Sequence, residues 1–175
     1  MIVAEPTDMK LIRLQKGILK LKLTRKGIAA HSGYPELGDS AIDPLVDVLY
    51  ELKNEDWPSS PELGATTLNI GMIHGGQAAN VLAEFASAFL MFRVTHDPQE
   101  LYDRVVSIVN GRLDIELFSM NSPVHLGQLE GFTSDVASFN TDIPYFKFDG
   151  TSYLIGPGNI TDAHCSREYI PLDQL

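Results

Sequence analysis

GILKLKLTRKG, residues 17–27, is the stretch that decides the fold of this chain. Leu19, Leu21 and Leu23 alternate with basic residues. Because successive side chains of a β-strand point to opposite faces of a sheet, this alternation predicts a strand with one apolar and one polar face. We therefore expect a strand that is half-buried against other elements.

The next segment, residues 40–54, changes to a helical period. Ser40 is available as its N-cap, and Pro44 is tolerated close to the first turn. The segment therefore predicts an amphipathic helix. Its apolar stripe consists of Ile42, Leu45, Val46, Leu49 and Leu52.

Two β-prone runs, residues 66–74 and 84–96, follow this helix. Asp97 and Pro98 then give a cap and a proline at the first helical position, which predicts a second helix that ends at Gly111. Its apolar stripe is expected to be Leu101, Val105 and Ile108. A last strand is predicted at residues 113–120. The order β-α-β-β-α-β is that of a ferredoxin-like domain in the α+β class.

This predicted block covers residues 15–122, and the segments on either side of it differ in character. Residues 1–14 and 123–175 contain short apolar stretches interrupted by Gly and Pro. Neither flank is expected to bury its apolar residues by itself. The pattern therefore predicts a ferredoxin-like unit inserted into a partial second domain.

Composition excludes several classes of protein. The net charge is -10, and seven of the 13 Lys and Arg residues lie within residues 1–26. Nucleic-acid binding needs an overall basic excess, so a nucleic-acid partner is not expected. No apolar run approaches the roughly 20 residues that cross a bilayer. Residues 1–10 lack the features of a signal peptide, and a single cysteine leaves the cellular compartment open.

A few polar residues could carry chemistry. His31 follows a predicted strand among small residues, and Arg93 lies near the end of an apolar strand. Such an arginine pairs with a carboxylate either of the protein or of a ligand. His164 lies beside Cys165, the only cysteine, and by itself it could be a ligand or a solvated residue. Asn80 is the remaining notable polar residue.

Six strings of this sequence together resemble one family. They are AEPTD (4–8), KGIAAHSGYPELGDSAI (26–42), TTLNIGMIHGGQAANV (66–81), FRV (92–94), FTSD (132–135) and GPGNITDAHCSREYI (156–170). On these strings, which occur in family order along nearly the whole chain, the sequence resembles the zinc-dependent aminoacylase, acetylornithine deacetylase and carboxypeptidase G metallopeptidase family. The resemblance is strongest to its fungal carboxypeptidase-like and acetylornithine deacetylase-like members.

The resemblance implies a zinc-binding α/β domain interrupted by a ferredoxin-like lid that also forms a homodimer. It implies that the family's two zinc ions would have Glu5 and His164 as one ligand each, both suitable ligand types. His31 would stabilise the oxyanion in the partner subunit's active site. Asn80, Arg93 and Thr133 would hold a small peptide or N-acyl amino acid substrate. Cys165 matches no ligand position and is expected to pack.

One departure from the family is serious. The family's His-x-Asp pair, bridging aspartate and Glu-Glu pair, which includes the general base, all precede the EPT string and do not occur in residues 1–175. Two ligands cannot hold two zinc ions, so we expect a fragment that is catalytically incomplete. The whole enzyme would cleave an amide bond next to a free carboxylate, as a carboxypeptidase or deacetylase. The alternative is a non-catalytic dimerisation or binding module.

Overall fold

The alternating stretch forms strand β3 (Gly17–Lys26), which lies inside a four-stranded antiparallel sheet. The computed structural model describes residues 1–175. The strand order is β6-β7-β3-β8, with β6 at Thr67–Gly75, β7 at Phe85–Val94 and β8 at Asp114–Asn121. This order, with every pair antiparallel, confirms the predicted ferredoxin-like arrangement.

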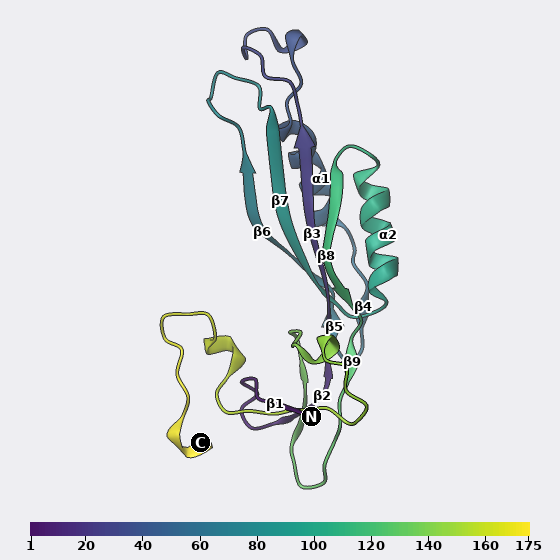
Figure 1. The fold of residues 1–175 in the computed structure, drawn as a ribbon, viewed down its shortest axis with the longest axis vertical. Coiled ribbons are helices and arrows are strands. Elements are labelled where there is room, and N and C mark those ends of the chain that lie inside the picture. Colours follow the sequence, from purple (N-terminus) through teal and green to yellow (C-terminus); the bar gives the residue numbers. More distant parts are fainter.

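Helices α1 (Ile42–Asn54) and α2 (Pro98–Val109) pack on one face of this sheet (Figure 1). Leu19, Leu21 and Leu23 are fully buried beneath them, in a core cluster of 17 residues. Burial of this apolar face is the main force that holds the lobe together. No helix of the chain is both long and apolar enough to cross a membrane.

Two predicted helix stripes were partly wrong. Val46 is 56% exposed, whereas Val48 is buried in its place. In α2, Leu101 and Val105 are buried as predicted, but Val109 is buried as well and Ile108 is only partly buried against the core. In each helix, the buried residue lies one or two positions from the predicted one. The cause is that the face a helix buries depends on how the helix is rotated about its axis against the sheet. The predicted cap was correct: the Asp97 carboxylate accepts a hydrogen bond from the Gln99 amide at 2.9 Å.

The opposite face of the four-stranded sheet, here called the open face, carries no helix (Figure 1). Residues in phase with Lys20 and Arg93 lie on it, since the intervening residues point into the core. This face is therefore available to a ligand or to another part of an assembly.

The two flanks pair with each other in a second, five-stranded sheet. Its strand order is β1-β11-β2-β10, and β9 also pairs with β2. The bounds are β1 Ile2–Val3, β2 Leu11–Gln15, β9 Val124–His125, β10 Ser134–Ala137 and β11 Tyr153–Leu154. Together the flanks bury a cluster of five residues: Ile12, Leu126, Ala137, Ile143 and Leu154.

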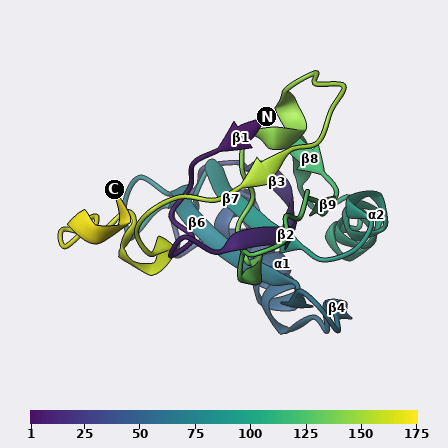
Figure 2. The same cartoon turned by 90° about the horizontal axis from the view of Figure 1, so that it is seen from below.

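The two lobes meet end to end (Figure 1), and in the view from below the five-stranded lobe lies in front of the other (Figure 2). Lys16 joins β2 to β3, and Ser122 and Pro123 lead from β8 to β9. A small hairpin, β4 (Ser59–Ser60) and β5 (Gly64–Ala65), lies beside this junction. Single 3-10 turns occupy Pro35–Leu37, Ile143–Tyr145, Ile160–Asp162 and Leu172–Gln174.

Candidate functional site

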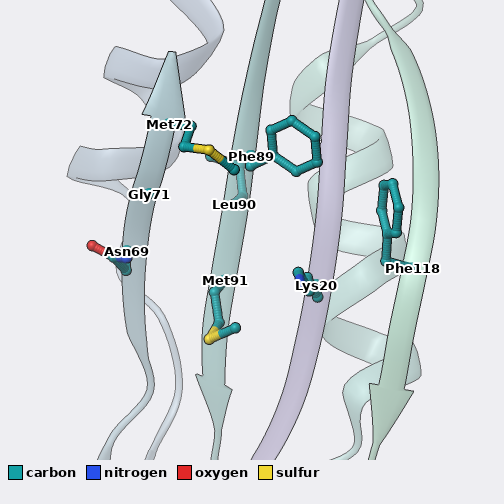
Figure 3. A pocket seen from close by; sticks show the side chains of 8 residues that line it. All are labelled: Lys20, Asn69, Gly71, Met72, Phe89, Leu90, Met91 and Phe118. Atoms are coloured by element: carbon teal, nitrogen blue, oxygen red, sulfur yellow. The ribbon is translucent and has the colours of Figure 1, made fainter. Parts of the chain in front are cut away.

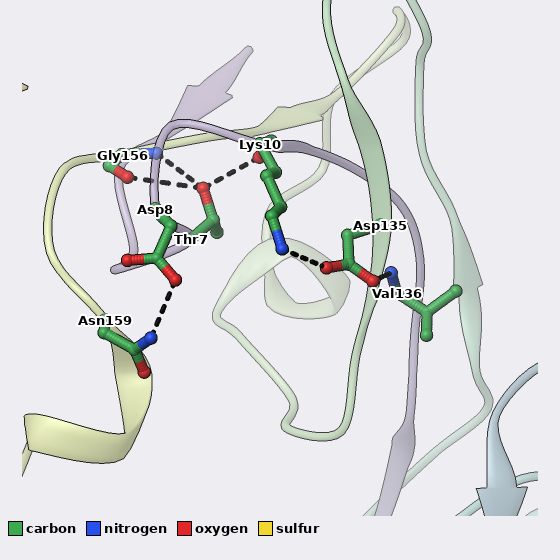
Figure 4. A network of polar contacts seen from close by, with 7 residues as sticks. All are labelled: Thr7, Asp8, Lys10, Asp135, Val136, Gly156 and Asn159. Carbon is green, nitrogen blue, oxygen red and sulfur yellow. Dashed lines mark hydrogen bonds and ion pairs between the residues drawn. The ribbon is translucent and has the colours of Figure 1, made fainter.

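The EPT string (residues 5–7) and the GPG string (residues 156–158) contact each other in the five-stranded lobe. The Thr7 hydroxyl accepts a hydrogen bond from the Gly156 amide at 3.1 Å, and the Thr7 amide donates to the Gly156 carbonyl at the same distance. The Thr7 hydroxyl also donates to the Lys10 carbonyl at 2.8 Å. Figure 4 shows this network. Two strings that lie about 150 residues apart in the sequence thus become neighbours.

The close approach of these strings explains the glycine at position 156. A Cβ atom there would lie 2.5 Å from the Glu5 carbonyl oxygen, which is a backbone clash. Asp8 lies beyond Thr7 with a φ of 52° and accepts a hydrogen bond from the Asn159 side-chain amide at 2.7 Å. The backbone around Glu5 is therefore fixed tightly against the GPG loop.

A second contact ties the FTSD string to the same region. The Lys10 ammonium donates to the Asp135 carboxylate at 2.9 Å (Figure 4). The Leu11 amide donates to the Thr133 carbonyl at 2.9 Å. The Lys10 hydrogen bond, and then that of the Val136 amide, lower the pKa of Asp135. Thr133 itself is exposed beside these contacts.

The two expected metal ligands do not form a metal site by themselves. Glu5 is partly buried, whereas His164 is exposed and has a φ of 60°. Nowhere in the chain do three His, Cys, Asp or Glu side chains gather closely enough to hold a metal ion. Catalytic zinc takes about three protein ligands, so the residues of this chain do not fit a complete zinc site.

Cys165 is exposed, and its thiol donates to the Asp162 carbonyl. The expectation that this side chain packs is therefore wrong. It lies outside both core clusters.

His31 and Asn80 come together at the end of the four-stranded lobe that is remote from the five-stranded lobe. The Ser32 amide donates to the Asn80 carbonyl at 2.9 Å, and an isolated antiparallel bridge joins His31 to Val81. The loops that follow β3 and β6 thus lie side by side. Both residues are exposed there.

One hydrogen bond fixes the tautomer of the neutral His31 ring. Its Nδ1 atom accepts a hydrogen bond from the Gly33 amide at 3.0 Å. A neutral imidazole carries one proton, so this contact places the proton on Nε2. The ring therefore presents Nε2–H as a free donor, next to the Tyr34 ring at a centroid distance of 6.0 Å.

Arg93 lies at the other end of the sheet, on the open face of β7. It is partly buried and forms no ion pair with any carboxylate of the chain. Burial lowers the pKa of Arg93, because loss of water penalises the charged form. Within these 175 residues, Arg93 therefore has no carboxylate partner.

Lys16 is a charged residue that sequence reasoning missed. Lys16 is buried, with only 4% of its surface exposed, and its ammonium donates a hydrogen bond to the Ala65 carbonyl at 2.5 Å. Burial, and then the charge of Arg93, lower the pKa of Lys16. The alternation of side chains along the strand could have indicated it. Lys16 lies two residues before Ile18, so their side chains point to the same face, and Ile18 is paired with Arg93. The two cations therefore share one face.

The fold and these strings define a class: a ferredoxin-like lid joined to a second, smaller lobe. The M20 peptidase dimerisation domain matches residues 13–117, more than half of the chain. The chain belongs to the M20 peptidase family and carries its dimerisation domain. Peptidases of this family are generally metal-dependent.

Fungal relatives agree with this assignment. The chain is 37% identical over 177 residues to a peptidase M20 domain-containing protein of Schizosaccharomyces pombe, and 36% identical over 200 residues to a protein of Paracoccidioides lutzii named probable carboxypeptidase. These alignments cover 99% and 100% of this chain. The chain spans less than half of the relatives' length, 44% and 45% respectively.

Solved structures share the fold at low sequence identity. A Staphylococcus aureus tripeptidase superposes with a TM-score of 0.65 at 18% identity, over 88% of this chain and 47% of its own. The aminopeptidase PepT of Bacillus cereus gives 0.65 at 17% identity, over 90% and 48%. The two-lobed arrangement is therefore that of known M20-type structures.

Proposed function

We propose that this chain is the lid, with part of the catalytic domain, of a di-zinc hydrolase that cleaves an amide bond next to a free carboxylate. The observation that carries the proposal is Arg93, a partly buried guanidinium without a carboxylate partner in its own chain. A planar guanidinium binds a carboxylate through two parallel hydrogen bonds. The substrate would be a small peptide or an N-acyl amino acid.

The proposed site draws on two copies of the chain. The register of β3 and β7 runs from Gly17 opposite Val94 to Lys26 opposite Phe85. At about 3.4 Å per residue, this separates the Arg93 end from the His31 end by roughly 30 Å. His31 and Asn80 therefore cannot reach the Arg93 of their own chain. A homodimer formed through the lid would bring them to the partner's Arg93.

Each side chain has one role in this proposal. Arg93 holds the free carboxylate, while Thr133 and the partner subunit's Asn80 orient the amide bond. His31 of the partner subunit donates its Nε2–H to the oxygen that becomes negative as the amide carbonyl is attacked. The Gly33 hydrogen bond to Nδ1 supports this role, since it keeps the donor on the outward-facing nitrogen.

Glu5 and His164 are proposed as one ligand to each of two zinc ions. The docking of the EPT and GPG strings supports the pairing, because it holds both segments in one lobe. The remaining ligands and the general base would come from residues outside this chain. Residues 1–14 and 123–175 would then belong to the catalytic domain and residues 15–122 to the lid.

Replacement of His31 by alanine in the full-length protein tests the catalytic role. We expect hydrolysis of N-acyl amino acids to fall by about 10²–10³-fold, the loss typical of an oxyanion donor. The matched control is His74→Ala, at another exposed histidine of the lid. A loss of less than about tenfold would contradict the role of His31.

Mixing two inactive variants tests the assembly. A dimer of one His31→Ala and one Arg93→Leu protomer contains one site with both defects and one intact site. In an equimolar mixture that exchanges subunits at random, half of the dimers are mixed. Roughly a quarter of all sites should therefore be intact, and the mixture should regain that share of the wild-type activity. If no activity returns although mixed dimers form, His31 and Arg93 act within one chain and the two-copy site is wrong.

The alternative function is a non-catalytic dimerisation or binding module. The separate core cluster of 17 residues in the four-stranded lobe favours it, since neither expected metal ligand, Glu5 or His164, belongs to this cluster. The presence of a His-x-Asp pair and a Glu-Glu pair upstream of residue 1 would favour the hydrolase, and their absence would favour the module. Zinc analysis of the purified chain checks the incomplete metal site that both functions assume. About two zinc ions per chain would contradict both the module and the incomplete site.

A further inference from the structure

The open face contains a shallow pocket of about 240 Å³ between β6, β7, β3 and β8. Figure 3 shows its lining, which is mainly apolar. It is lined by Lys20, Asn69, Gly71, Met72, Phe89, Leu90, Met91 and Phe118. Met72 and Phe118 are each 50% exposed, so this apolar surface faces solvent in the isolated chain.

Two irregularities in the sheet build this pocket. The register of β6 with β7 shifts between Ile70 and Met72, which leaves Gly71 without a partner. The register of β3 with β8 shifts between Lys20 and Leu21, which leaves Phe118 without one. Such bulges redirect side chains and are over-represented beside active sites.

The bulge in β6 also makes room. Gly71 has no side chain, and a Cβ atom there would meet nothing closer than 3.5 Å. On the opposite wall, the redirected Phe118 ring packs at a tilt against Phe89, with a centroid distance of 5.8 Å. One wall is thus emptied and the other is filled by an aromatic ring.

Arg93 lies on the same face, directly beyond the pocket. Met91 precedes it by two residues on β7 and Phe89 by four, so the three side chains point the same way. Two residues of a strand span about 7 Å. A carboxylate on Arg93 is therefore about one side-chain length from the pocket.

Charge on this face favours an anionic ligand. Lys16, Lys20 and Arg93 are all in phase on it, and none of them forms an ion pair with a carboxylate of the chain. This contrasts with the net charge of -10 for the whole chain. The face therefore has Lys16 and Arg93 at one end, beside the apolar pocket, and Lys20 in the lining of the pocket itself.

We infer that the pocket receives the large apolar side chain of the amino acid whose carboxylate Arg93 holds, and so selects substrates with an aromatic or long aliphatic residue at that position. The inference rests on the proposed function. The pocket is smaller than the roughly 300–1,000 Å³ of sites that enclose whole ligands, which fits a single side chain.

Methionine methyl groups give a direct readout in the 175-residue chain. Of its five methionines, Met72 and Met91 line the pocket. Met120 packs against the core on the other face, and Met1 and Met9 belong to the five-stranded lobe. We would label the methionine methyls with ¹³C and titrate the chain with N-acetyl-L-phenylalanine, N-acetylglycine, N-acetyl-L-glutamate and N-acetyl-L-phenylalanine amide.

The expected result depends on both the ring and the carboxylate. N-acetylphenylalanine should shift Met72 and Met91 but not Met9 or Met120. It should bind about tenfold more tightly than N-acetylglycine, because the ring buries apolar surface. The amide, which lacks the carboxylate, should bind more weakly, and Arg93→Leu should abolish binding of both acids.

Filling the pocket should remove the preference. Gly71→Leu has space for its Cβ, so the chain should fold, and the two acids should then bind within about twofold of each other. Should this variant misfold, Phe118→Ser tests the opposite wall of the pocket at a half-exposed position. The matched control for Phe118→Ser is Val46→Ser, on the exposed side of α1. This control should leave the preference for N-acetylphenylalanine over N-acetylglycine intact.

Each contrary outcome has its own meaning. Equal affinity for the two acids, with loss of both in Arg93→Leu, overturns the pocket and leaves the proposed function standing. Binding of neither acid overturns both. A preference for N-acetylglutamate over N-acetylphenylalanine assigns the pocket to an acidic side chain through Lys20 and overturns the inference. Met72 and Met91 shifts that follow protein concentration alone show self-association through this face and also overturn it.

Discussion

Asp135 illustrates what a single contact does for the candidate site. It joins strand β10 to the turn before β2 through Lys10, and it accepts the Val136 amide at 2.8 Å. The neighbouring Thr133 is thereby held near the EPT string. Because the two side chains of the ion pair are 43% and 45% exposed, solvent screens their attraction and the pair contributes little stability.

Replacement of Asp135 by asparagine should give a small, pH-dependent loss of stability. The folded-state pKa of Asp135 lies below the ordinary value of 3.8. The ion pair therefore stabilises the fold above that pH, and its contribution disappears as the pH falls through the folded pKa. We expect the free energy of unfolding to drop by no more than about 1 kcal/mol at neutral pH.

Urea unfolding of both proteins at several pH values would measure this difference. It should narrow as the pH is lowered from about 5 towards 3. Asp56→Asn, at an exposed carboxylate without an ion pair, changes the net charge equally and serves as the control. A difference that grows on acidification would contradict the assigned role of Asp135.

At the scale of the element, β7 serves two purposes through its two faces. Ala86, Ala88, Leu90, Phe92 and Val94 are buried against the helices. The residues between them include Phe89, Met91 and Arg93, which face the other way. Because the strand is central in the sheet, its rigid core face positions the residues of the open face.

Phe92→Ala should destabilise the four-stranded lobe strongly. The Phe92 ring is fully buried and packs edge-on against Trp57 at a centroid distance of 5.0 Å. Its loss leaves a cavity, so we expect a cost of about 3–5 kcal/mol. Phe85→Ala, at a 42% exposed position of the same strand, should cost about 1 kcal/mol or less.

Fluorescence of Trp57, the only tryptophan, would follow the unfolding of this lobe in denaturant. If Phe92→Ala and Phe85→Ala lowered the free energy of unfolding equally, the core would not lie between the helices and the face of β7 that carries Phe92.

At the scale of the whole molecule, the two lobes differ in the size of their cores. The four-stranded lobe buries a cluster of 17 residues, and the five-stranded lobe buries one of five. The strands β1, β9 and β11 are each two residues long. Since stability follows buried apolar surface, the two lobes should open with different free energies.

Hydrogen exchange should resolve this difference. Amides of β10 and β11 should exchange faster than those of β3 and β7. Leu154→Ala, at a fully buried position of the small cluster, should accelerate exchange in the five-stranded lobe and leave β3 and β7 protected. Uniform exchange along the chain, or equal acceleration in both lobes, would show that they unfold as one unit.

Much of the fold could be predicted because its signals are local. The alternation in residues 17–27 and the Asp97 cap depend only on neighbours in the chain, and both predictions were confirmed. The rotation of α1 was not predictable in the same way, since Val46 and Val48 are both apolar and only packing against the sheet selects one. The pairing of Ile2 with Tyr153 left no periodic signal in strands of two residues.

The sequence by itself determined the order of the elements and the family, because periodicity and short strings are properties of the chain. Only the tertiary structure decided which of these strings meet. It joined the EPT string to the GPG string, and it separated His31 from Arg93 by the length of the sheet. It also left Arg93 unpaired beside an apolar hollow made by two bulges. Long-range strand pairing and register produce these relations, and neither can be read from neighbouring residues.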